Sequence, residues 1–130
     1  MSNGTSFCAS GDCFLNRVLP DSPGSAFEAL AALIGRADVR LTNLETTVDS
    51  GGCYPAATSG GTWARADAEV LSVFKKYHFN LVGWANNHSL DYSHGGLLAT
   101  ARALDEAGLK HAGAGEDLSL IHISEPTRPY

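Results

Sequence analysis

Short apolar segments alternate with amphipathic ones along this chain. The apolar segments predict strands over residues 5–10, 39–44 and 79–85, and residues 110–112 are a candidate fourth strand. Between them, apolar residues recur every three or four positions, which predicts helices over residues 26–36, 66–77 and 95–107. This β-α-β-α-β-α-β order predicts an α/β fold in which a largely parallel sheet carries helices on both faces.

Three local signals indicate where the helices and loops begin and end. Ser25, with Glu28 three residues later, forms a capping-box pattern at the start of the first helix. Gly35 and Gly108 suit the ends of the first and third helices. Residues 46–62 are rich in Gly, Ser, Thr and Pro and lack periodicity, which predicts a functional or mobile loop.

Length and composition narrow the class of protein. With 130 residues, of which 44% are hydrophobic and 18% charged, the chain has the composition of one small globular domain. Its formal net charge of −5 and the absence of a Lys/Arg block argue against nucleic acid or an anionic membrane surface as a partner. An anionic polymer or phosphoester substrate held by a metal ion stays open, because the ion reverses the local charge.

The chain carries no signal that directs it to a membrane. Residues 1–6 have neither the basic nor the apolar region of a signal peptide, and no apolar run reaches the roughly 18 residues of a membrane span. We therefore expect a soluble, cytoplasmic protein, and a leader upstream of Met1 stays open. Cys8, Cys13 and Cys53 form no C-x-x-C pair, so we expect free thiols rather than disulfides.

The last thirteen residues, 118–130, change character abruptly. The stretch from Leu118 to Arg128 resembles, residue for residue, a translation of the adapter used in transposon-based sequencing libraries. Such segments are excluded from reasoning about the fold. We therefore treat residues 1–117 as the native part of the domain, and His122 is not a candidate ligand. The alternative is a natural strand over residues 118–123.

Polar side chains gather where three predicted strands end. The clusters are Gly11-Asp12, Asn43-Leu44-Glu45, and Asn86-Asn87-His88 with Asp91. Because ligands bind at the carboxyl ends of strands in open α/β sheets, we expect these clusters to converge. Carboxylates, an amide oxygen and an imidazole are suitable ligands for a hard metal ion.

Each cluster alone has a simpler interpretation. Asp12 fits a capping residue in a common Gly-Asp turn, and Glu45 fits a solvated residue after a strand. Asn86-Asn87 fits a turn, and Asp91 fits a turn or helix cap equally well. The coincidence of all three clusters at strand ends is what favours a site.

These residues resemble the CapA, or poly-γ-glutamate capsule biosynthesis, family. Gly11-Asp12 followed by Arg17 is similar to that family's G-D-x-x-x-x-R opening, and residues 37–45 are similar to its A-D…N-L-E segment. Residues 85–92, A-N-N-H-S-L-D-Y, match its most specific signature, and residues 113–115 match the G-A-G after the next strand. The resemblance covers roughly residues 5–117.

The resemblance implies a truncated metallophosphoesterase-like, or calcineurin-like, fold with a site for two divalent metal ions (Mn, Fe, Zn or Mg). Carried over by motif position, Asp12 would bind one ion, Glu45 would bridge the two, and Asn87 would bind the second. His88, with Asp91, would take the catalytic role of stabilising or protonating the leaving group, for which imidazole is well suited.

Some features depart from the phosphoesterase pattern. Phe14 stands where that superfamily has a His two residues after the first Asp, and Glu45 stands where Asp is usual. The downstream Gly-His-x-His segment of the superfamily is missing from this sequence. Arg17 fits a ligand of an anionic substrate and a surface residue equally well. The remaining histidines of the native part are expected in structural roles: His78, His94 and His111.

Two functions stay open after this comparison. The first is a metal-dependent hydrolase or transferase acting on a phosphoester or a γ-glutamyl amide. The second is a non-catalytic component of capsule-polymer assembly or anchoring. A nucleotide-binding domain is disfavoured, because neither G-x-G-x-x-G nor G-x-x-x-x-G-K-[ST] occurs. We expect this chain itself to bind metal weakly and to show no turnover, because part of the ligand set is missing.

Overall fold

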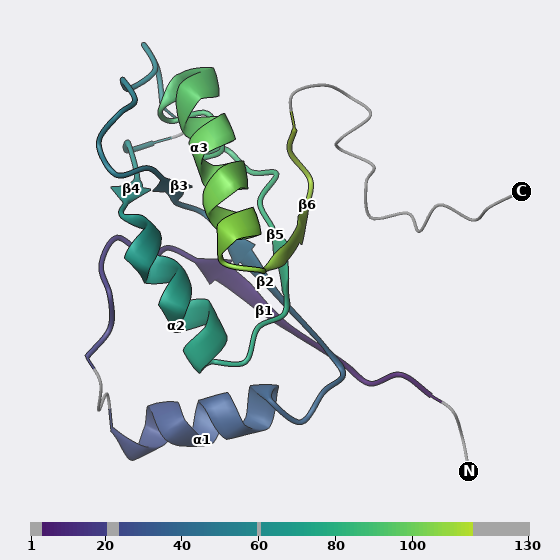
Figure 1. The fold of residues 1–130 in the computed structure, drawn as a ribbon. Helices are drawn as coiled ribbons and strands as arrows, with labels where there is room; N and C mark the ends of the chain where they lie inside the picture. Colours follow the sequence, from purple (N-terminus) through teal and green to yellow (C-terminus); the bar gives the residue numbers. More distant parts are fainter. Residues whose placement is uncertain (1–3, 21–23, 60, 116–130) are drawn as a thin grey trace, which may run out of the picture.

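Strands and helices alternate through the computed structural model, which describes residues 4–20, 24–59 and 61–115 (Figure 1). The predicted tail, residues 118–130, lies outside the described residues. In the described part, no helix is long and apolar enough to cross a membrane. In chain order the elements are β1 (Phe7–Cys13), α1 (Ser25–Ile34), β2 (Val39–Leu44), β3 (Thr47–Val48), β4 (Arg65–Ala66), the 3-10 turn η1 (Ala68–Val70), α2 (Leu71–Lys76), β5 (Leu81–Gly83), α3 (Ser93–Glu106) and β6 (Lys110–Ala112).

The main sheet has four strands in the order β1-β2-β5-β6, and every neighbouring pair is parallel. This confirms the predicted α/β class and the largely parallel sheet. The predicted bounds of β2 and β6 are also confirmed. A second sheet, β3 paired with β4, was not predicted. Its two-residue strands are too short to produce a periodic pattern, which is why residues 46–62 predicted a loop and residue 66 a helix.

The start of α1 differs from the predicted capping box. The N-cap is Gly24, with φ 106° and ψ 163°, and no side chain caps the helix. The Gly24 carbonyl accepts the N–H groups of Phe27 and Glu28, so Ser25 already lies inside the first turn. Ser25 therefore cannot cap this helix. The predicted end of α3 is confirmed, because Gly108 follows the helix with φ 66°.

All three helices lie on one face of the sheet, and the prediction that both faces carry helices is wrong. Each crossover adds the next parallel strand on the same side of the previous one, and right-handed crossovers in one direction place every helix on the same face. Ile34 of α1 packs against Val73 of α2 and Tyr77 at the C-cap of α2, which joins these two helices.

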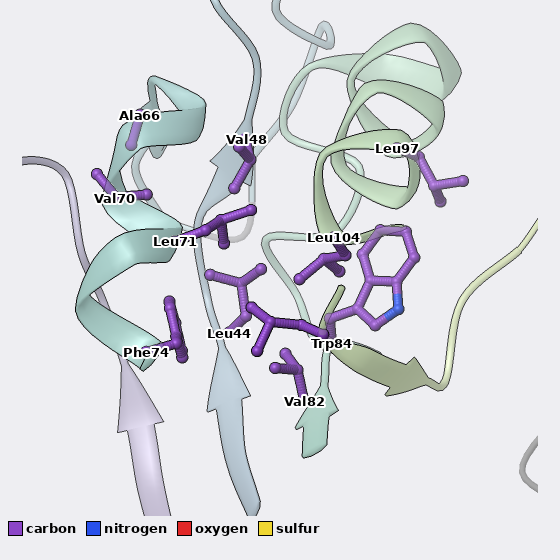
Figure 2. Packing of buried hydrophobic residues seen from close by; sticks show 11 residues of the cluster. Leu44, Val48, Ala66, Val70, Leu71, Phe74, Val82, Trp84, Leu97 and Leu104 are labelled. Atoms are coloured by element: carbon purple, nitrogen blue, oxygen red, sulfur yellow. The ribbon is translucent and has the colours of Figure 1, made fainter. Parts of the chain in front are cut away.

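The core lies between this sheet and helices α2 and α3 (Figure 2). Alternate residues of β2 and β5 face the helices, so Leu44 and Val82 are buried while their strand neighbours are less so. Trp84, immediately after β5, is 2% exposed and belongs to the same cluster. Thr100 of α3 ties the small sheet to this core, since its hydroxyl accepts the Val48 N–H at 2.9 Å.

The opposite face of the sheet is open in the described structure. Residues that pair across the strands share this face, among them Phe7 with Val39, and Leu41 with Leu81. Phe7 is 62% exposed, and the other three are half-buried. Parallel sheets normally bury both faces, so this face is an unusual apolar surface.

Burial within the helices predicts which leucine contributes most to stability. Leu104 of α3 is fully buried, whereas Leu33 of α1 is 58% exposed. Leu104→Ala is expected to lower the free energy of unfolding by about 3 kcal/mol, from lost transfer energy and the cavity left behind. Leu33→Ala, the same change in another helix, should cost less than about 0.5 kcal/mol. Denaturant unfolding measures both, and equal losses would contradict the packing described.

Asp49, after β3, makes the turn 49–53 sensitive to acid. Burial acts to raise the pKa of this carboxyl, but backbone N–H donors from Cys53 and Gly52 outweigh it and hold the pKa below its ordinary value. A lowered folded-state pKa contributes stability above the unfolded-state pKa, and this contribution is lost as pH falls below about 4. Asp49→Asn should therefore flatten the acid dependence of thermal unfolding, measured as melting temperature against pH, and an unchanged acid dependence would contradict this role of Asp49.

Candidate functional site

A one-residue irregularity in β1 decides where Asp12 lies. Ala9 pairs with Leu41, but Asp12 pairs with Asn43, so β1 uses one more residue than β2 over this stretch. The bulge falls at Ser10 and Gly11. Without it, Gly11 would lie beside Asn43 and Asp12 beside the buried Leu44. Bulges often re-aim side chains near functional sites in this way.

The hydroxyl of Thr42 lies against the bulge. Ser10 donates to Thr42 Oγ1 at 2.9 Å, and the Thr42 hydroxyl lies 3.4 Å from the Gly11 carbonyl oxygen. Thr42 is fully buried, so its polar contacts stabilise the bulge rather than exchanging with solvent. Cys13, which follows Asp12, points toward the core, and burial raises the pKa of its thiol. Cys13 therefore behaves as a packing residue rather than a thiolate ligand.

Asn43 joins the two predicted carboxylate ligands. Its Nδ2 lies 2.9 Å from Asp12 Oδ1 and 3.4 Å from Glu45 Oε1. Each of these bonds uses one oxygen of a carboxylate. Asp12 is exposed and Glu45 half-buried, so the pair is accessible from solvent.

Asn86 connects this carboxylate pair to the loop after β5. Its Nδ2 donates to Asn43 Oδ1 at 3.1 Å and to the Leu44 carbonyl at 2.7 Å, while its Oδ1 accepts the His88 N–H at 3.0 Å. The structure thus brings the ends of β1, β2 and β5 together, as expected for a site at the carboxyl edge of a parallel sheet. Sequence reasoning placed Asn43 and Asn86 in the polar clusters but gave neither a role.

His88 and Asp91 form a buried pair beneath this edge. His88 Nδ1 lies 2.8 Å from Asp91 Oδ2, and the two residues are 8% and 1% exposed. The same Asp91 oxygen accepts the backbone N–H of Ala64 at 2.7 Å. Since an ionised carboxylate can only accept hydrogen bonds, Nδ1 of His88 is the donor, and Nε2 is the nitrogen left for proton exchange.

Phe14 packs against the imidazole of His88. The ring centroids are 5.5 Å apart and the planes meet at 75°, an edge-to-face contact. Phe14 occupies the position where the phosphoesterase pattern has a His, and here it offers a ring edge instead of a nitrogen ligand.

Asn87 and Arg17 are the remaining predicted site residues. Asn87 is exposed at the same strand end, between Asn86 and His88 in sequence. Arg17 is exposed in the segment after β1, and within residues 4–20, 24–59 and 61–115 no hydrogen bond or ion pair links it to the cluster. The structure therefore places Asp12, Glu45, His88 and Asp91 around the Asn43–Asn86 pair and leaves Arg17 outside it.

The other histidines have structural surroundings. His78 follows α2 in the left-handed region, with φ 65°, and donates its N–H to the Lys75 carbonyl. His94 is the second residue of α3. His111 of β6 pairs with Asp105 at 3.2 Å and contacts the Trp84 ring. These positions agree with the predicted structural roles.

The predicted ligands of the candidate site offer only oxygen atoms, the donor type that hard divalent cations take. Asp12, Glu45 and Asn87 would bind through carboxylate and amide oxygens, which Mg²⁺ and Mn²⁺ prefer. In the described part of the chain, no group of three His, Cys, Asp or Glu side chains lies close enough to hold a metal ion. The two carboxylates alone therefore supply the charge, which is a small ligand set for a tightly bound ion.

Comparison with known proteins agrees with the motif resemblance. The family described as "Bacterial capsule synthesis protein PGA_cap" matches residues 6–121. The uncharacterized protein y4sH of Sinorhizobium fredii is 37% identical over 117 residues, which are 88% of this chain and 25% of that protein. A probable polyglutamine synthesis accessory protein of Mycobacterium tuberculosis is 38% identical over 92 residues, 70% of this chain and 24% of that protein.

These matches cover nearly all of the described structure, but the chain spans only about a quarter of the length of the curated relatives it matches. The family match includes every strand of the main sheet and each of the polar clusters at the strand ends. The chain therefore belongs to the bacterial capsule synthesis protein family, PGA_cap.

Proposed function

We propose that this chain contributes the N-terminal part of a metal-dependent site that acts on an anionic capsule polymer, poly-γ-glutamate, or on a phosphoester in its synthesis. The observation that carries this proposal is the convergence of Asp12 and Glu45 on one amide, beside a buried His88–Asp91 pair. A cation held by the carboxylates would polarise the substrate and activate water. Asp12, Glu45 and Asn87 are the residues that would hold it.

His88 supports this proposal through its fixed orientation. Asp91 holds Nδ1, so Nε2 is the atom that would give or take a proton at the leaving group. Phe14 shields one side of the ring from water. Asp91 therefore acts as a positioning residue for His88, in the way that a carboxylate orients a catalytic imidazole elsewhere.

The donor chemistry of the proposed ligands supports a ranking of the candidate ions. Phe14 replaces the nitrogen ligand of the phosphoesterase pattern, and the proposed ligands Asp12, Glu45 and Asn87 all bind through oxygen. Oxygen ligands suit Mg²⁺ and Mn²⁺, whereas Zn²⁺ in proteins usually takes several nitrogen or sulfur ligands. We therefore place Mn²⁺ or Mg²⁺ ahead of Zn²⁺ and Fe.

A non-catalytic role in polymer assembly is the second candidate. One relative in Mycobacterium tuberculosis is described as a probable polyglutamine synthesis accessory protein, and accessory proteins need not carry out chemistry. The small number of charged ligands in the described structure also favours this alternative. Under it, the polar clusters would serve to join strand ends, and metal binding at Asp12 and Glu45 would be absent.

The metal site predicts where a paramagnetic ion will broaden the NMR spectrum. Mn²⁺ added to the 130-residue chain should bind weakly and broaden amide signals first around Asp12, Glu45 and Asn87. Glu45→Gln should remove most of this broadening, since it deletes one of two charged ligands. The exposed Glu69→Gln serves as the matched control and should change nothing. If the same amide signals broaden to the same extent in Glu45→Gln, the result favours the non-catalytic role.

The His88–Asp91 pair predicts an unusual tautomer. Because Asp91 accepts from Nδ1, neutral His88 should carry its proton on Nδ1, and ¹⁵N spectra of the side chain distinguish the two nitrogens. His111 is an internal control, since its Nε2 pairs with Asp105 and should carry the proton instead. If both histidines show the Nε2–H form, Asp91 does not orient His88, and the proposed acid–base role fails.

A further inference from the structure

We propose that Asn43 and Asn86 are positioning residues that hold the Asp12 and Glu45 carboxylates side by side for a cation, without binding the cation themselves. This inference rests on the proposed metal site and adds to it two residues that no predicted ligand set contains. The argument depends on the polarity of each hydrogen bond, starting from backbone groups whose roles are fixed.

Asn86 has only one possible orientation. A backbone carbonyl can only accept and a backbone N–H can only donate, so the contacts with Leu44 O and His88 N fix which end of the Asn86 amide is oxygen. The amide nitrogen must face Leu44, at 2.7 Å, and the amide oxygen must face the His88 N–H, at 3.0 Å. Rotating this amide by half a turn would break both bonds.

The orientation of Asn86 then sets the orientation of Asn43. Asn86 Nδ2 is a donor, so the atom of Asn43 that lies 3.1 Å from it must be the amide oxygen. The Asn43 nitrogen consequently points the other way, toward the carboxylates. Nothing in the amide of Asn43 alone would distinguish its two ends, because oxygen and nitrogen are nearly equal in size.

Asn43 in turn offers one N–H to each carboxylate. Its nitrogen lies 2.9 Å from Asp12 Oδ1 and 3.4 Å from Glu45 Oε1, and the amide has two hydrogens to donate. Two carboxylates at adjacent strand ends repel one another, and shared donors between them reduce that repulsion. If the amide were reversed, its oxygen would face both carboxylates and push them apart. The hydrogen bonds from Asn86 to Asn43, and from Asn43 to Asp12 and Glu45, thus hold the two carboxylates side by side before a cation binds.

Substitution of Asn43 or Asn86 should weaken metal binding, although neither residue is a proposed metal ligand. Outer residues that orient metal ligands typically contribute ten- to a hundredfold to metal affinity. We expect Asn86→Ala and Asn43→Ala each to raise the Mn²⁺ dissociation constant of the 130-residue chain roughly tenfold. Because Asn86 acts through Asn43, the double variant should bind Mn²⁺ no more weakly than Asn43→Ala alone.

Asn80 offers a matched control for the fold. It also bridges β2 and the β5 segment, accepting the Arg40 N–H at 2.9 Å and donating to the Asp38 carbonyl at 2.9 Å, but at the opposite end of these strands. Asn80→Ala should lower the melting temperature while leaving the Mn²⁺ dissociation constant unchanged. If Asn80→Ala weakens Mn²⁺ binding as much as Asn86→Ala does, the effect is one of stability and the inference is overturned.

A second measurement needs no metal. Exchange of the Asn43 side-chain NH₂ hydrogens with solvent should be slowed in the native chain and should quicken several-fold in Asn86→Ala, whereas the Asn80 NH₂ should be unaffected. Unchanged Asn43 exchange overturns the positioning role even if Mn²⁺ binds. Failure of Mn²⁺ to bind the native chain overturns the proposed metal site, whatever the exchange result, so the two failures are distinguishable.

Discussion

The bulge in β1 is the constraint on which the site depends. A parallel strand in regular register would place Asp12 opposite the buried Leu44, where a carboxylate would lose its hydration without a partner. The extra residue at Ser10-Gly11 shifts the strand by one position. Asp12 then lies next to Asn43 at the open edge, and Cys13 takes the position beside Leu44 that suits an apolar side chain. One irregular step therefore satisfies the core and the site together.

The same strand end serves two purposes through side-chain alternation. Leu44 faces the helices and joins the main core, while its carbonyl oxygen accepts the Asn86 amide. Asn43 and Glu45, on either side of it, face away from that core. Packing of Leu44 thus fixes the backbone from which the polar residues project, and a rigid strand holds them more accurately than a loop would. The hydrogen bond between the Leu44 carbonyl and the Asn86 amide therefore couples packing of the core to the geometry of the site.

The sequence predicted the elements with strong patterns and the approximate place of the site. β2 and β6 were predicted to the residue, β2 from the apolar positions within Val39–Leu44 and β6, Lys110–Ala112, from its place just after the helix end at Gly108. The pairing of β3 with β4 was not predicted, because sixteen residues, 49–64, separate the two strands and two-residue strands carry no period. The helix cap at Gly24 and the single helical face were missed for another reason. Both depend on tertiary geometry, which no local pattern encodes.

The candidate site was predictable in composition but not in connectivity. Polar residues at three strand ends indicated Asp12, Glu45 and His88, and the structure brings these strand ends together. The roles of Asn43 and Asn86 could not be predicted, since an amide can donate or accept and its direction depends on neighbours distant in sequence. Only the backbone contacts with Leu44 and His88 settle that direction.

The two halves of the site differ in how strongly the fold constrains them. His88 and Asp91 are buried and paired, Asp91 also accepts the Ala64 N–H, and the His88 N–H donates to Asn86 Oδ1, so several bonds fix their geometry. Asp12 lies exposed at a strand end and depends on one amide for its position. Asn86 links the two halves, because it accepts the His88 N–H and donates to Asn43, which in turn donates to Asp12. Local motion at the exposed half would therefore displace the Asp12 carboxylate first, while the His88 imidazole would keep its orientation.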